Sequence, residues 1–465
     1  MEDVANSGNL PFKVTAVAAG EAHTLLLAGD GRVYSWGRGT LGRLGLGSEQ
    51  DQLFPAQVKF GSQESIRIVG IAAGAYHSLA LADDGSVWCW GYNLYGQLGI
   101  INEEDAHNPK YTDGYYSVVP CLLNKFLELH PPDSSTLLLE EVEGKAQLKI
   151  ISIKAGGMMS LSIDNLGALW MWGNCPHQSK EGIFSIVSNF TPTPVWDFHG
   201  HTVVKVACGN EHIIALVSVG ESYNGENDDL ICYSWGNNNH GQLGLGDTED
   251  RPNPEMVKTF DQDSHWSIYE IACGAFHTAL LTHRKRPNDD TLESVCWTFG
   301  LGENGQLGHG TTQSTSIPEL VQELPQFVNL VSVDCGLFHT CVVSSDGDVW
   351  SWGMEKGLGL YPDARVVGEY SSDALSPLVV SNPYEAKFLE PVQVACGAAH
   401  TIIVAQEGYK VWSLGRGRSG VLGNGNVVDC YIPTLVLWPP LVEDFHFKQE
   451  EPSSFRELDK GKEED

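Results

Sequence analysis

The chain has 465 residues, a formal net charge of −31 and a sequence pI of about 4.7. Binding to nucleic-acid phosphates needs clustered lysine and arginine side chains, so this balance argues against direct DNA binding and favours a basic protein partner. The eleven cysteines include no Cys-x-x-Cys pair, which argues against disulfide or zinc frameworks and indicates a reduced protein. The sequence starts acidic and polar, and no apolar run approaches membrane-spanning length. We therefore expect a cytoplasmic and/or nuclear protein without a membrane segment.

A turn motif that places a small residue before Gly-x-x-His-Thr/Ser occurs in seven copies. The first copy, residues 19–24, reads AGEAHT, and a β-branched run such as VVKVA at 203–207 leads into each turn. Met159 replaces the histidine in the third copy. The other six copies carry the histidine, at His23, His77, His212, His277, His339 and His400. Four copies have cysteine before the glycine, and we interpret these as small buried apolar side chains: Cys208, Cys273, Cys335 and Cys396.

Two strands joined by a hairpin follow each turn motif. The separation of Gly20 from Trp36 recurs between Gly74 and Trp90, with an apolar strand, a turn and a second strand between them. Asp-Gly pairs at 30–31, 84–85 and 346–347 predict tight hairpin turns. The fourth and fifth copies insert polar residues at this hairpin position, namely 218–229 and 283–294.

The second strand runs into a glycine-rich loop of the form G-Q-L-G-x-G. The clearest copy is SWGNNNHGQLGLG at 234–246. We expect its glycines where the backbone needs positive φ or close approach, and its leucines packed against apolar neighbours. Further copies occupy 35–47, 89–100, 298–310 and 413–425. The strands that end at Gly173 and Gly353 lead into loops without this pattern.

In units two to seven, a proline-led strand ahead of the β-branched run supplies the fourth strand, at 55–58, 120–123, 194–196, 254–257, 318–321 and 377–380. Four strands in each of seven units are typical of a β-propeller. We therefore predict an all-β fold, a single seven-bladed β-propeller of four-stranded blades over residues 14–440, with no separate second domain. A short N-terminal lead (1–13) precedes it, and an acidic, disordered tail (441–465) follows it.

One further proline-led strand, at 433–436, follows the seventh unit, whereas the first unit has no room for one. We expect this C-terminal strand to pair into the first blade and close the ring, because closure hides the strand edges that a linear array would expose.

The paired turn motif and glycine loop resemble the repeats of the regulator-of-chromosome-condensation family, whose members form seven-bladed propellers. The resemblance covers residues 14–438, although the third copy and the loop after the sixth depart from the pattern. In the ultraviolet-B receptor branch the same turn carries tryptophan and arginine. Here those positions hold Glu21 and Ala22 in the first copy, and no copy has either residue type, so we do not expect photoreception.

The sequence contains no P-loop, nucleophile elbow or zinc-site spacing. The six repeat histidines fall in different blades, so we interpret them as structural groups bonded to the backbone of their own turns. Tryptophans that alternate along the strands are interpreted as core residues. We expect no metal, no cofactor and no ordinary enzyme, with nucleotide exchange as the one catalytic function left open.

Strand alternation places three insertions on one face of the predicted ring, in consecutive units. These are 124–147, after the proline-led strand of the third unit, and the long hairpins 218–229 and 283–294. The first two are acidic, and the third contains a basic triplet that is also a weak nuclear-import signal. The candidate partner-binding residues are Glu128, Asp133, Glu140, Glu141, Glu221, Glu226, Asp228, Asp229, Arg284, Lys285 and Arg286.

These features favour a monomeric protein-interaction scaffold that binds a protein partner, basic or a small GTPase, through loops on one face. The alternative is a guanine-nucleotide exchange factor for a small GTPase, since the resemblance implies that the founding family member acts in this way. That member also carries a basic chromatin tail, which this chain lacks. A second alternative is a histone or chromatin reader, because basic histones suit an acidic surface.

Overall fold

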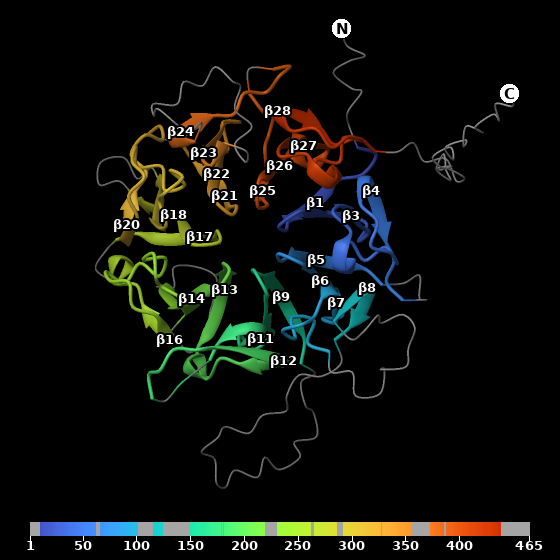
Figure 1. The fold of residues 1–465 in the computed structure, drawn as a ribbon. Coiled ribbons are helices and arrows are strands. Elements are labelled where there is room, and N and C mark those ends of the chain that lie inside the picture. Colours follow the sequence, from blue (N-terminus) through green and yellow to red (C-terminus); the bar gives the residue numbers. More distant parts are fainter. Residues whose placement is uncertain are drawn as a thin grey trace, which may run out of the picture.

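The computed structural model describes residues 10–438 except 62–65, 101–114, 124–147, 178, 180, 219–229, 262–264, 286–291, 327, 356–372 and 386. In this part of the chain, seven antiparallel sheets of four strands each stand as blades around a central axis (Figure 1). The predicted all-β, seven-bladed propeller is confirmed. The predicted N-terminal lead lies mostly, and the tail at 441–465 wholly, outside the described residues.

Each blade uses four strands that are consecutive in sequence, and the first of them lies nearest the axis (Figure 1). Blade one contains β1 (Val14–Ala19), β2 (His23–Ala28), β3 (Val33–Gly37) and β4 (Gln52–Val58). Blade two contains β5 (Ile68–Ala73), β6 (His77–Ala82), β7 (Val87–Tyr92) and β8 (Tyr116–Leu122). Blade three contains β9 (Ile150–Ala155), β10 (Met159–Asp164), β11 (Leu169–Pro176) and β12 (Ile186–Pro194).

Blades four to seven continue the same order around the ring. Blade four contains β13 (Thr202–Cys208), β14 (His212–Ser218), β15 (Leu230–Gly236) and β16 (Arg251–Met256), and blade five contains β17 (Ser267–Cys273), β18 (His277–Lys285), β19 (Leu292–Gly300) and β20 (Thr315–Leu320). Blade six contains β21 (Leu330–Cys335), β22 (His339–Ser344), β23 (Val349–Gly353) and β24 (Ala374–Val379). Blade seven contains β25 (Gln393–Cys396), β26 (His400–Ala405), β27 (Lys410–Gly415) and β28 (Cys430–Leu435). Five 3₁₀ turns lie among the described connections: η1 (Thr40–Gly42), η2 (Trp196–Phe198), η3 (Lys258–Phe260), η4 (Gln406–Gly408) and η5 (Arg418–Gly420).

The C-terminal strand β28 does not pair into the first blade, so this part of the closure prediction is wrong. It pairs with β27 inside the seventh blade, for example at Ser413↔Thr434. Each proline-led strand likewise pairs with the aromatic strand before it, as at Ser35↔Ala56. The glycine loop therefore joins the third and fourth strands of one blade, and the repeats begin one strand later than predicted.

Side-chain contacts and loop hydrogen bonds, and not an exchanged strand, close the ring between blades seven and one. The Gln393 amide of β25 accepts a hydrogen bond from the backbone N–H of Val17 (3.1 Å) and donates to its carbonyl oxygen (2.9 Å). One polar side chain thus links the innermost strands of the two blades. Trp36 Nε1 of blade one donates to the carbonyl oxygen of Val421 in the blade-seven glycine loop (2.8 Å), and red and blue blades meet there in Figure 1.

Neighbouring blades share apolar clusters built from a glycine-loop leucine and the tryptophan of the next blade. Leu98 and Trp172 bury against each other in this way, with Leu79 and Ile150 in the same cluster. Gly45 has a φ of 71°, and a Cβ there would strike the Trp90 indole, so the loop needs glycine at the contact. The core role predicted for the tryptophans before the glycines is confirmed at Trp36, Trp90, Trp172, Trp235 and Trp352.

Candidate interaction surfaces

The propeller has two faces with different connections. We call hairpin face the side that carries the β2–β3-type hairpins and the connections between blades. We call glycine-loop face the side that carries the turn motifs and the glycine loops. Hydrogen bonds confirm this division. The backbone N–H of Lys149, at the start of blade three, donates to the side-chain oxygen of the hairpin residue Asn165. The backbone N–H of the next residue, Ile150, donates to the carbonyl oxygen of the hairpin residue Gly85 in blade two (3.4 Å).

The hairpin face holds the ends of all three sequence-predicted insertions. Of the candidate partner-binding residues, the structure describes Arg284 and Lys285. The others lie outside the described residues: Glu128, Asp133, Glu140, Glu141, Glu221, Glu226, Asp228, Asp229 and Arg286. The structure also moves the first insertion, because its proline-led strand β8 belongs to blade two and the insertion joins blades two and three.

The blade-five insertion is partly a β-ribbon and not only the polar loop predicted for it. The ladder between β18 and β19 continues through Arg284↔Glu293 to Lys285↔Leu292. The Arg284 guanidinium contacts Glu293 Oε2 (2.9 Å) and lies 4.3 Å from the centre of the Trp266 ring. Arg284 is therefore held against the blade by an ion pair and a cation–π contact, while its side chain remains 45% exposed.

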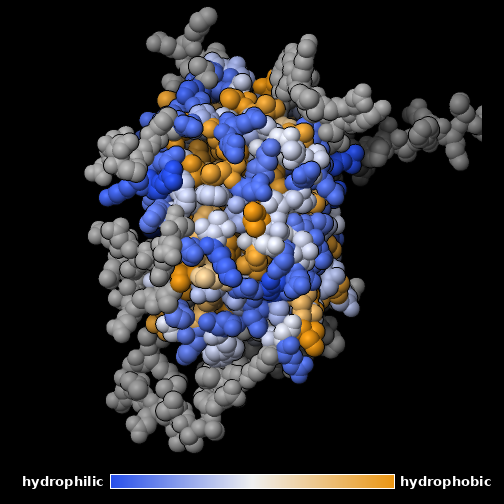
Figure 2. All heavy atoms as spheres, turned by 90° about the vertical axis from the view of Figure 1, so that its left-hand side faces the viewer, coloured by the Kyte–Doolittle hydropathy of each residue, from blue (hydrophilic) through white to orange (hydrophobic). Residues whose placement is uncertain are grey.

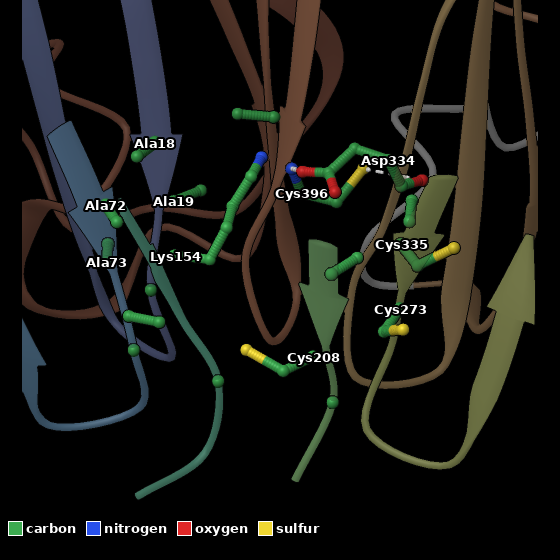
Figure 3. A pocket seen from close by; sticks show the side chains of 18 of the residues that line it. Ala18, Ala19, Ala72, Ala73, Lys154, Cys208, Cys273, Asp334, Cys335 and Cys396 are labelled. Atoms are coloured by element: carbon green, nitrogen blue, oxygen red, sulfur yellow. Dashed lines mark hydrogen bonds between the residues drawn. The ribbon is translucent and has the colours of Figure 1, made fainter. Parts of the chain in front are cut away.

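A central channel with a volume of about 980 Å³ runs between the innermost strands. Small side chains, including the repeat cysteines, line much of its wall (Figure 3). Burial raises the pKa of the Cys208 thiol to about 12, so this thiol is not a nucleophile at neutral pH. All eleven cysteines are free, and the described residues offer no group of three or more His, Cys, Asp or Glu side chains placed to hold a metal ion.

The charged groups in the channel tie one blade to the next. Asp334 Oδ2 accepts a hydrogen bond from the backbone N–H of Cys396 (2.7 Å), the contact drawn in Figure 3. Enclosure in the channel raises the pKa of Asp334 to about 6, and the charge of Lys154 opposes part of that rise. Lys205 bridges blades four and five, with its ammonium 3.0 Å from Glu270 Oε2. These contacts make the channel wall a structural element of the ring.

The repeat histidines form a joint between blades that the sequence did not predict. His23 Nε2 lies 2.8 Å from Ser78 Oγ in the next blade, and Ser78 Oγ donates to the carbonyl oxygen of Arg43 (2.9 Å). Trp90 Nε1 donates to the same carbonyl (2.9 Å). Because Ser78 commits its proton to the carbonyl, His23 donates through Nε2. The structural role was predicted, but the expected bonding within each turn is wrong.

The joint recurs at six blade boundaries, and both of its members are missing at the seventh. The pairs are His23–Ser78, His77–Ser160, His212–Thr278, His277–Thr340, His339–Thr401 and His400–Thr24. Between blades three and four, Met159 replaces the histidine and Ile213 replaces the hydroxyl-bearing residue. Burial lowers the histidine pKa, to about 4 for His77 and about 3 for His277, so the rings are neutral at pH 7.

The sequence profile of the RCC1-like domain family matches residues 2–280 and 127–449. The chain belongs to this family. It is 29% identical over 428 residues to the ultraviolet-B receptor UVR8 of Arabidopsis thaliana, covering 92% of this chain and 82% of UVR8. It is 25% identical over 383 residues to the human E3 ubiquitin-protein ligase HERC2, covering 82% of this chain and 7% of HERC2. A match to so small a part of HERC2 does not transfer its ligase activity.

Solved structures of two further proteins share the fold. Prp20p of Saccharomyces cerevisiae superposes with a TM-score of 0.65 at 23% identity, covering 94% of this chain and 89% of Prp20p. Human WBSCR16 superposes with a TM-score of 0.64 at 20% identity, covering 88% of this chain and 94% of that structure. Among the described residues there is no helix long and apolar enough to cross a bilayer.

Proposed function

We propose that this RCC1-like propeller is a protein-interaction scaffold whose partner is a basic protein that binds the hairpin face between blades two and five. The observation that carries the proposal is the position of the three insertions. Their described ends all lie on the hairpin face: Leu123 and Leu148, Ser218 and Leu230, and Lys285 and Leu292. Long connections gathered on one sector of a rigid ring are typical of a binding surface.

The charge of the insertions supports a basic partner. Residues 124–147 and 218–229 contain carboxylates at Glu128, Asp133, Glu140, Glu141, Glu143, Glu221, Glu226, Asp228 and Asp229, against Lys125 and Lys145. In the third insertion, the Glu293 ion pair already neutralises Arg284. Such a surface accelerates encounter with a cationic partner and loses affinity as salt screens the charges.

The relatives suggest two classes of partner, histones and small GTPases, which an experiment that captures the partner should distinguish. The Prp20p structure was described together with the binding of that protein to Gsp1p and to histones. A histone-type partner would satisfy the charge argument directly. A small GTPase would support the alternative of nucleotide exchange, which requires faster nucleotide release in the presence of the chain.

The test compares affinity capture by the intact chain with capture by two charge variants. E221Q/E226Q/D228N removes three carboxylates from the blade-four insertion. The matched control E181Q/E249Q/E303Q removes three from exposed positions on the glycine-loop face. We expect the first variant, and not the control, to lose the partner at physiological salt. Retention of every partner by the hairpin-face variant, with no salt dependence, would contradict the proposal.

A further inference from the structure

We infer that the glycine-loop face carries a second binding site, for an acidic segment of a partner protein, at the junction of blades seven and one. We call it the arginine patch and define it as Arg38, Arg416 and Arg418 with the neighbouring Val427 and Val428. It lies on the opposite face from the proposed basic-partner surface and has the opposite charge, so it goes beyond the function proposed above.

Two of the arginines occupy the same repeat position in adjacent blades. The backbone N–H of Arg38 donates to the carbonyl oxygen of Ala22 in its turn motif (2.8 Å), and that of Arg416 to Ala399 (2.7 Å). The other five blades make the same contact with uncharged residues: Tyr92, Asn174, Asn237, Leu301 and Met354. The repeat therefore places positive charge at this position only where blades seven and one meet.

The patch is continuous across the blade boundary. The short turn η5, which begins at Arg418, packs on blade one, because a Cβ on Gly420 would strike Leu53 of β4. The turn motifs of the two blades also touch, since the backbone N–H of Ala398 donates to the carbonyl oxygen of Glu21 (3.3 Å). A ligand that contacts Arg418 therefore also reaches the surface of blade one.

The arginines of the patch have no carboxylate within 4.0 Å among the described residues. Arg251, on the same face in blade four, contacts three carboxylates instead, those of Asp247, Glu249 and Glu255. In a chain with a net charge of −31, three arginines on adjoining loops with no carboxylate partner among the described residues indicate an external anion.

Two aspartates of the loops that carry Arg38, Arg416 and Arg418 brace the loop backbone. Asp51 Oδ1 accepts a hydrogen bond from the backbone N–H of Gly39 (2.9 Å), and Asp429 Oδ1 accepts one from Gly417 (2.9 Å). Each aspartate holds the loop that presents an arginine. The loops are thus ordered while the cationic side chains stay available.

Exposed valines beside the arginines favour a polypeptide over a nucleic acid. Val427 and Val428 are 55% and 64% exposed, and the Val428 carbonyl packs against Gly417, between Arg416 and Arg418. The corresponding loop positions in three other blades are polar: Glu49 and Gln50, Thr248 and Glu249, and Thr312 and Gln313. Apolar and cationic groups side by side fit a segment with both carboxylates and apolar side chains, and the overall charge opposes phosphate binding.

The experiment places a photo-crosslinking residue in the patch and identifies the segment that it captures. Val427→p-benzoylphenylalanine is compared in a cell lysate with Thr248→p-benzoylphenylalanine, the corresponding exposed position in blade four. We expect position 427 to capture protein segments of net negative charge. In the same background, R416Q/R418Q should reduce capture at least about tenfold, and R32Q, an arginine of the hairpin face, should leave it within about twofold.

Several outcomes would overturn the inference. Capture of basic segments, of nucleic acid or of a second copy of this chain would assign the patch a different ligand. Equal yields at positions 427 and 248 would mean that the patch is ordinary surface. If R416Q/R418Q unfolds the blade, as judged by its melting temperature, R38Q on the adjacent blade repeats the test. The hairpin-face variant E221Q/E226Q/D228N should leave the cross-link unchanged, which separates this site from the proposed function.

Discussion

At the scale of single residues, the repeat histidines stabilise the ring by linking blades. At Ser78, Ser160, Thr278 and Thr340, the neutral imidazole of the preceding blade donates to a hydroxyl whose own proton goes to a glycine-loop carbonyl, so buried polar atoms of two blades satisfy one another. The sequence predicted a structural histidine but not this partner, because the hydroxyl comes from the next repeat. The repeat histidine is replaced at Met159 and the repeat hydroxyl at Ile213, in consecutive copies, and this paired replacement is a signal in the sequence that could have identified the histidine–hydroxyl pair.

Replacing one joint histidine should destabilise the propeller. His277 Nε2 lies 2.9 Å from Thr340 Oγ1, and the ring is fully buried. We expect H277A to lower the free energy of unfolding by about 1–3 kcal/mol, since the hydroxyl loses its donor. Urea denaturation measures this, with T340V and the double mutant completing a cycle. Additive effects of the two single mutants would show that the pair is not coupled.

The boundary between blades three and four offers the reverse experiment. M159H alone should destabilise the protein, because the new buried imidazole would face Ile213 and find no acceptor there. Adding I213T should recover a large part of the loss by restoring the joint found at the other six boundaries. Melting temperatures of the wild type and the two variants test this, and no recovery in M159H/I213T would contradict the proposed cause of the paired loss.

The same histidines should make the propeller sensitive to acid. Their folded-state pKa values, about 4 for His339 and about 3 for His400, lie below the ordinary value of 6.5, so the unfolded chain binds more protons between these limits. The contribution of these histidines to the free energy of unfolding should therefore be fully present above about pH 6.5. It should decrease as the pH falls towards 4, by up to about 1.4 kcal/mol per pH unit for each histidine. The raised pKa of Asp334 makes its own contribution to stability increase as the pH falls, but this single carboxyl group is outweighed by the six repeat histidines.

Urea unfolding at pH 7.5, 6.5 and 5.5 tests this dependence. H277Q, whose amide does not titrate, is the matched variant and should show a shallower loss of stability with falling pH than the wild type. A pH slope that is identical in the two proteins would assign the acid sensitivity to other groups.

At the scale of elements, the sequence predicted the strands better than their grouping. The turn motifs and the Asp-Gly hairpins lie where the pattern placed them, for example β7 (Val87–Tyr92) after Asp84-Gly85. Each strand predicted to start at a proline begins before it, and at 194–196 the prediction fails, because β12 ends at Pro194 and η2 begins at Trp196. A periodic sequence does not show where one unit ends, so Pro55 was assigned to the second blade although β4 completes the first. Pairing across the glycine loop depends on three-dimensional contacts such as Ser35↔Ala56, which strand patterns do not encode.

Truncation tests the corrected role of the last strand. Deletion from Cys430 onward removes β28, leaves the edge of β27 unpaired and takes away Val436 and Trp438, which pack with blade one. We expect this truncation to lose cooperative unfolding or to aggregate. Deletion from Lys448 onward keeps β28 and should leave the melting temperature within about 2 °C. Equal melting temperatures for the two proteins would count against a structural role for β28.

At the scale of the whole molecule, the ring is a rigid frame with two differently built faces. The repeat pattern predicted the frame because seven similar units constrain one another, whereas function depends on the places where units differ. The predicted acidic positions from Glu128 to Asp229 are such departures, and so is the change from Gln50 in blade one to Val428 in blade seven. The outer edge of blades five and six, by contrast, is mostly hydrophilic with scattered apolar residues (Figure 2).

Closure without an exchanged strand predicts that the ring tolerates new termini at a blade boundary. Phe12 and Trp438 lie side by side, with ring centroids 5.2 Å apart, so a short Gly-Ser linker can join these two positions once the residues outside them are removed. A circular permutant that opens between Gly61 and Ile66, in the connection from β4 to β5, keeps all seven sheets intact.

We expect this permutant to fold cooperatively and to melt within about 5 °C of the parent chain, because every sheet hydrogen bond is retained. Differential scanning calorimetry provides the measurement. The control opens the ring between Asp30 and Gly31, which sends β2 and β3 of blade one to opposite ends of the chain, so that this blade then depends on pairing between the termini. The control should melt lower than the boundary permutant. If the boundary permutant fails to fold while the control folds, the blades are not the independent units that the sheet order implies.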